Sequence, residues 1–112
     1  MKYFVTEVER NASGSTCYFE FQKGKIKNKY WLKDSIYLHA DLFDELMLFH
    51  LFSASLGSFD YYGPTNVVSK VKWNIIVEKS KENAQWEIVV QELMPWVEEC
   101  FIKHSYFTIC GI

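Results

Sequence analysis

Residues 86–101 read WEIVVQELMPWVEECF, and residues 106–110 read YFTIC. In the first stretch apolar residues recur at steps of three and four from Trp86 to Phe101, while acidic and amide residues occupy the other side. This spacing predicts an amphipathic helix, in which Pro95 should cause a kink or begin a second helix. The second stretch is rich in β-branched and aromatic residues, which indicates a strand that joins a sheet. A long helix followed closely by such a strand indicates the α+β class.

A second helix is predicted over residues 42–52, which are apolar nearly all round and therefore typical of a buried helix. Asp41 is its predicted N-cap. Asp44 and Glu45 would then lie in the first turn, where the helix dipole favours negative charge.

Gly57 ends this helix and opens a loop over residues 58–66, which we expect at the surface because it holds a second glycine, a proline and three aromatics. Residues 67–79 fit two patterns. Val71 and Trp73 belong to an alternation typical of a strand, whereas Trp73 and Ile76 also share one helical face. We prefer a helix here, and a strand stays open as the alternative.

The first third of the chain favours antiparallel strands. Residues 3–10 alternate loosely, turn-forming residues follow at 11–15, and apolar side chains alternate with polar ones over residues 17–22. A tight turn then leads into a third strand over residues 25–31, and residues 35–39 add a short one. The first three strands would form an antiparallel meander.

Lysines recur along and beside the third predicted strand, where a period of two would place them on one face. They are Lys23, Lys25, Lys27, Lys29 and Lys33. A solvated face or a charge-protected sheet edge explains such a ladder. A surface that recognises an acidic protein, or a phosphate backbone, explains it as well.

Together these elements predict a single domain over residues 1–112, because a chain of 112 residues with 49% hydrophobic residues suits one core. The predicted architecture is an antiparallel sheet of about four to five strands, the N-terminal meander plus the C-terminal strand, packed against about three helices. The net charge of −2 disfavours a nucleic-acid partner. We see neither a signal peptide nor a membrane span, so we expect a cytoplasmic protein without a membrane partner.

Catalytic and metal-binding patterns are weak. The cysteines Cys17, Cys100 and Cys110 are odd in number and widely spaced, which predicts buried, reduced thiols rather than disulfides or a zinc knuckle. Cys100 and His104 stand at i and i+4, but the predicted C-terminal end of a helix raises a thiol pKa instead of lowering it. We therefore predict no enzyme activity, no metal and no cofactor.

Four short segments nevertheless carry a resemblance. Residues 59–65, 72–73, 92–96 and 107–112 resemble, in this order, segments of small bacterial immunity proteins, the antidotes of polymorphic toxin and contact-dependent growth inhibition systems. The resemblance implies a cytoplasmic, non-catalytic protein that binds and neutralises one cognate toxin domain. It implies no fixed contact residues, because antidotes diverge with their toxins.

From the residues themselves we predict partner contacts at Asp60, Tyr61 and Tyr62, since tyrosine gives a large contact area at low entropy cost, with Glu98 and Glu99 as an acidic surface. An alternative is that the tyrosines only pack the loop on the sheet.

Two other functions stay open, and both a monomer and a homodimer are compatible with the sequence. One is a small enzyme or ligand-binding protein with a pocket near His39, His50 and Cys100. The other is a homo-oligomeric module in which a second copy covers the apolar helix at residues 42–52.

Overall fold

The computed structural model describes residues 2–26 and 29–112, and in this part of the chain five strands form one antiparallel sheet. The strands are β1 (Phe4–Val5), β2 (Tyr18–Lys23), β3 (Ile36–His39), β4 (Asn66–Ser69) and β5 (Tyr106–Cys110). Their order across the sheet is β1-β3-β2-β5-β4. The central strand β2 pairs with β3 on one side and with the C-terminal strand β5 on the other. This arrangement confirms the α+β class and the place of β5 in the sheet. The predicted N-terminal meander is wrong in its order, because β1 pairs with β3 and not with β2.

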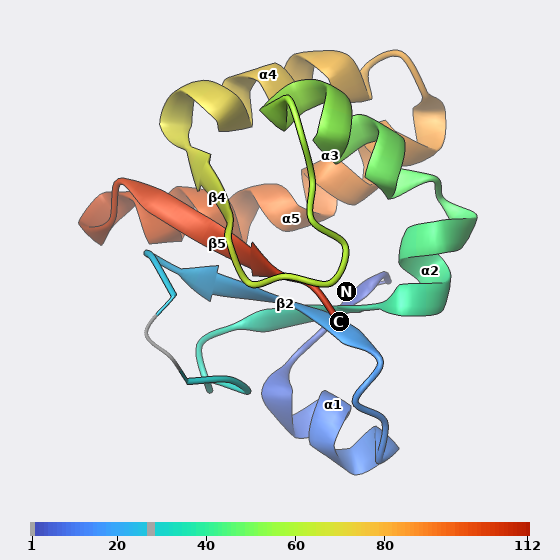
Figure 1. The fold of residues 1–112 in the computed structure, drawn as a ribbon, viewed down its shortest axis with the longest axis vertical. Helices are drawn as coiled ribbons and strands as arrows, with labels where there is room; N and C mark the ends of the chain where they lie inside the picture. The colour runs from blue at the N-terminus through green and yellow to red at the C-terminus, as the bar shows by residue number, and fades with distance from the viewer. Residues whose placement is uncertain (1, 27–28) are drawn as a thin grey trace.

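Five helices accompany the sheet: α1 (Glu7–Ser13), α2 (Ala40–Glu45), α3 (Leu48–Leu56), α4 (Lys70–Ser80) and α5 (Ala84–Lys103). Figure 1 shows α3 and α4 together on the side of the sheet away from α1. Phe21 of β2 approaches Phe52 of α3, and Phe107 of β5 contacts both Trp73 of α4 and Trp96 of α5. These aromatic contacts place the hydrophobic core between the sheet and the three longer helices.

Glu20 and Gln22 alternate with the core phenylalanines of β2 and therefore point to the other face of the sheet. Both are buried nonetheless. The carboxylate of Glu20 accepts hydrogen bonds from the backbone N–H groups of Trp31 and Leu32, and the Gln22 side chain donates to the carbonyl of Lys29. The segment that precedes β3 thus covers this face through its backbone.

These contacts correct the strand predicted over residues 25–31. Among the described residues of this segment no strand forms, because their backbone groups bind side chains of β2 while β3 takes the place beside it. The lysine ladder therefore does not lie along a strand: Lys23 ends β2, Lys27 falls outside the described residues, and the other three lysines belong to the connection.

Two further strand and helix boundaries differ from prediction, and capping explains both. The strand expected over residues 3–10 ends at Val5, since Thr6 and Glu9 form a capping box that begins α1. Residues 67–79 divide into β4 and α4, because the Ser69 side chain accepts a hydrogen bond from the N–H of Lys72 and caps the helix. The stretch thus begins as a strand and continues as a helix, so each of the two predicted patterns describes one part of it.

The apolar helix expected over residues 42–52 is two helices. Met47 has a φ of 55°, and this left-handed residue separates α2 from α3. The N-cap of α2 is His39, whose Nδ1 accepts a hydrogen bond from the N–H of Asp41 at 3.0 Å, and not Asp41 itself. Asp44 and Glu45 consequently lie in the last turn of a short helix.

The predictions for the long helix, for Gly57 and for the cysteines are confirmed in most respects. The long helix is confirmed, and α5 runs without interruption through Pro95 instead of restarting there. Gly57 ends α3 with a φ of 87°. Cys100 and Cys110 are buried as expected, but Cys17 is exposed because it lies before β2 enters the sheet.

None of the described helices combines the length and the apolar character that crossing a membrane requires.

Candidate protein-binding surface

The loop between α3 and β4 is fixed to the core by a phenylalanine. Phe59 is buried, and its ring stacks on that of Phe43 with 5.5 Å between the ring centroids. We call residues 58–65 the tyrosine loop, because Tyr61 and Tyr62 lie at its centre. Burial of a large ring at its start gives this loop a defined position on the fold.

A single amide side chain holds the tyrosine loop against the sheet. Asn66, only 7% exposed, donates from Nδ2 to the carbonyls of Asp60 (2.8 Å) and Ile109 (3.0 Å). Its Oδ1 accepts a hydrogen bond from the N–H of Asp60 at 2.8 Å. The first residue of β4 therefore binds the loop and the last strand at the same time.

The C-terminal tail fixes the loop from a second side. The N–H of Gly111 donates to the carbonyl of Gly63 at 2.9 Å, and the N–H of Ile112 donates to that of Tyr61 at 3.0 Å. A side chain on Gly111 would collide with the backbone of Tyr61, so only glycine permits this approach. Figure 1 shows the loop passing beside the C-terminus.

The two tyrosines of this loop differ in burial and in their contacts. Tyr61 is half-buried, with its ring edge-on to Phe19 at 5.1 Å, and its hydroxyl donates to the carboxylate of Asp44 on α2 at 3.0 and 3.1 Å. Burial, with the Asp44 contact acting in the same direction, raises the pKa of Tyr61 to about 12, so the phenol remains a donor. Tyr62 is 78% exposed beside it.

Carboxylates lie beside the two tyrosines: Asp44 accepts from the Tyr61 hydroxyl, and Asp60 accepts from the N–H of Tyr62. Residues 34–69 contain five acids and no lysine or arginine. All five acids are exposed, and the charges of Asp44 and Asp41 both reach the Tyr61 hydroxyl. We define the acidic tyrosine face by five residues: Asp41, Asp44, Asp60, Tyr61 and Tyr62. It combines the exposed ring of Tyr62 with three exposed carboxylates.

No family model, curated protein or solved structure matches the chain. In the described part of the chain, no three His, Cys, Asp or Glu side chains are grouped to hold a metal. On the acidic tyrosine face the Tyr61 phenol is a hydrogen-bond donor, and the carboxylates of Asp44 and Asp60 are acceptors.

The predicted contact residues separate into two places. Asp60, Tyr61 and Tyr62 lie together on the tyrosine loop, whereas Glu98 and Glu99 lie on α5, outside the acidic tyrosine face. Glu99 pairs with Lys23, and the hydrogen bond from that lysine lowers the pKa of the Glu99 carboxyl.

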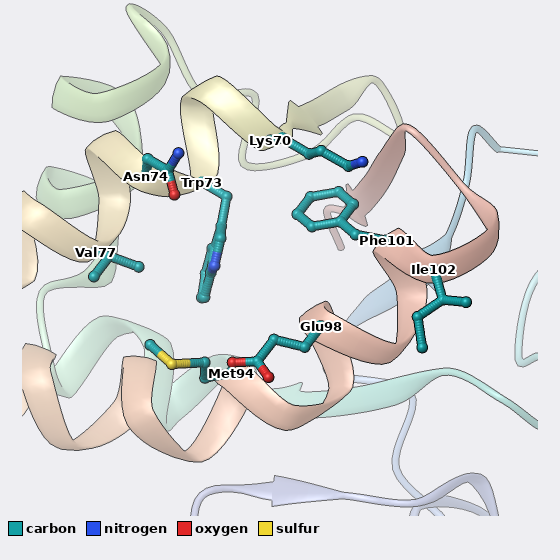
Figure 2. A pocket seen from close by; sticks show the side chains of 8 residues that line it. All are labelled: Lys70, Trp73, Asn74, Val77, Met94, Glu98, Phe101 and Ile102. Carbon is teal, nitrogen blue, oxygen red and sulfur yellow. The ribbon is translucent and has the colours of Figure 1, made fainter.

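Glu98 lines a groove between α4 and α5, with a volume of about 500 Å³ (Figure 2). Its lining is mostly apolar and includes Trp73, Val77, Met94 and Phe101.

Sequence patterns missed Asp41 and Asp44 as members of the face and assigned them to helix capping. The signal that could have found them is the absence of basic residues from 34 to 69.

The residues of the alternative pocket have three separate environments. His39 caps α2, His50 is exposed on α3, and Cys100 is buried in α5, where its thiol lies 3.3 Å from the carbonyl of Tyr106. Burial raises the pKa of the Cys100 thiol. That direction agrees with the sequence argument against a catalytic Cys100–His104 pair, although the cause is burial and not the helix dipole.

Proposed function

We propose that this chain is an immunity protein that binds and neutralises a cognate bacterial toxin domain in the cytoplasm, without catalysis, and that the acidic tyrosine face is its toxin-binding surface. The observation that carries the proposal is the exposed Tyr62 on a loop held by Asn66 and by the C-terminal tail. A loop that is already ordered loses little entropy on binding, which favours high affinity.

The negative charge of the acidic tyrosine face indicates the charge of the toxin surface that binds it. The carboxylates of Asp41, Asp44 and Asp60 lie near Tyr61 or Tyr62, within a stretch of chain that has no lysine or arginine. Lysine or arginine side chains of the toxin would pair with these carboxylates, and an arginine would also stack on the exposed phenol. The contact surface of the toxin domain is therefore basic.

The test uses the toxin domain encoded beside this chain and isothermal titration calorimetry. Tyr62→Ala should weaken binding by about 2 kcal/mol, or roughly thirtyfold, as removal of a central aromatic anchor does. It should also abolish protection of cells that express the toxin domain.

The matched control is Ile88→Ala, which removes an apolar side chain that is 50% exposed on α5. Circular dichroism verifies that both variants fold. A toxin domain that binds Tyr62→Ala as tightly as the unaltered chain would exclude the acidic tyrosine face, and the absence of any binding would exclude the immunity function.

A further inference from the structure

The groove between α4 and α5 is lined by apolar side chains that the fold covers only in part, with Trp73, 6% exposed, as its most buried member. Figure 2 shows Trp73 and Val77 on α4 facing Met94 and Phe101 on α5 across an open space. Ile102, at the rim on α5, is 79% exposed. Half-buried apolar side chains beside a protruding isoleucine are typical of an interaction site rather than of solvated helix surface.

Opposite charges stand on the two walls of this groove. Lys70 lies on α4 with its ammonium group 5.9 Å from the centroid of the Phe101 ring, and Glu98 projects from α5 (Figure 2). Within the described residues neither Lys70 nor Glu98 takes part in a salt bridge. The groove therefore offers one positive and one negative group, both available to a partner.

We propose that a second copy of this chain docks in the groove, related to the first by a two-fold axis that runs along it. Such an axis lays α4 of each copy on α5 of the other, because it exchanges the two walls. Lys70 of each copy then meets Glu98 of the other, and Ile102 covers apolar side chains across the interface. The groove surface of one copy is therefore complementary to the same surface of the other copy, as an isologous dimer interface requires.

The proposed dimer does not depend on the toxin-binding proposal. The groove and the acidic tyrosine face share no residue, since one is built from α4 and α5 and the other from α2 and the tyrosine loop. Each copy in the dimer keeps its own acidic tyrosine face.

Sedimentation velocity of the full chain at increasing concentration tests the proposal. The mass should rise from the 13.3 kDa of one chain toward twice that value. Ile102→Glu should weaken the dimer about tenfold or more, because it places a charge in the apolar interface. The control Ile88→Glu, on α5 but outside the groove, should leave the dimer unchanged.

Charge exchange gives the sharper test of the arrangement. Lys70→Glu and Glu98→Lys should each weaken the dimer, because each places like charges opposite one another, and the double variant should restore it. A chain that stays monomeric at every concentration would overturn the proposal. So would a dimer that tolerates Ile102→Glu, or a double variant no tighter than the single ones.

Discussion

The carboxylate of Glu20 shows how one side chain redirects a whole segment. It is 2% exposed and accepts hydrogen bonds from two backbone N–H groups, from the hydroxyl of Ser35 and from that of Tyr37. A buried carboxylate needs such donors, so it draws the backbone of residues 31 and 32 toward the sheet. Trp31 adopts a φ of 60° there, and the Arg10 guanidinium lies 4.0 Å from the centroid of its ring.

The three cysteines should differ sharply in reactivity. Burial, followed by the charge of Glu20, raises the pKa of Cys110 to about 12, and burial also raises the pKa of Cys100. Since the thiolate is the reactive form, both buried thiols should be inert near neutral pH, while the exposed Cys17 reacts. Mass spectrometry after brief treatment with iodoacetamide should find one modified cysteine in the native chain and three in urea. Rapid modification of Cys110 in the native chain would contradict this.

At the scale of the elements, local signals define segments and long-range contacts fix their ends. The helix α5 is defined by the periodicity of its apolar residues and by its N-cap. The N-cap is Asn83, whose side chain accepts hydrogen bonds from the N–H groups of Gln85 and Trp86. The tyrosine loop is different. Its position depends on Asn66, which directly follows it, and on β5 and the tail, which are distant from the loop in sequence.

Asn66→Ala should destabilise the fold and loosen the tyrosine loop. The substitution leaves the N–H and the carbonyl of Asp60 and the carbonyl of Ile109 without their partner in a buried place, which should lower the free energy of unfolding by about 2–3 kcal/mol. Urea denaturation measures this change. Toxin affinity should fall as well, because the loop is no longer ordered before binding.

Asn11→Ala provides the matched control, since the same side chain is removed from an exposed position on α1. Its effect on the free energy of unfolding should stay within about 0.5 kcal/mol. Equal destabilisation by the two substitutions would show that Asn66 does not hold the loop.

The basic residues are unevenly distributed over the whole molecule. All twelve lysines and arginines lie outside residues 34–69, which supply α2, α3 and the tyrosine loop. In Figure 1 α2 lies at one side of the molecule, and the connection between β2 and β3, which carries several lysines, lies at the other. Such a polarity orients an approaching charged partner before contact.

Association with the toxin domain should therefore slow as salt increases. We expect the association rate to fall by roughly tenfold from low to physiological ionic strength, because screening weakens attraction between exposed charges. Stopped-flow fluorescence measures the rate. Asp41→Lys should reduce the salt dependence, since this aspartate side chain is 91% exposed on the acidic tyrosine face. Glu82→Lys makes the same charge change at an exposed site away from that face. Identical salt dependence of the two variants would contradict the proposed docking surface.

The amino-acid sequence alone determines the elements whose signals are short in range. The α+β class, the long helix, the C-terminal strand and the loop after Gly57 follow from periodicity, β-propensity and turn residues, which act within a few positions. The partition of residues 66–80 between β4 and α4 lies at the limit of this information, because one stretch carries both patterns.

Only the tertiary structure decides how those elements meet. Asp44 and Tyr61 are 17 positions apart and become neighbours because Met47 turns α2 away from α3 while Phe59 enters the core. Glu20 likewise finds its donors 11 and 12 positions away. Buried polar groups must find partners wherever the packed core leaves them, and that requirement is set by the whole fold rather than by any local pattern.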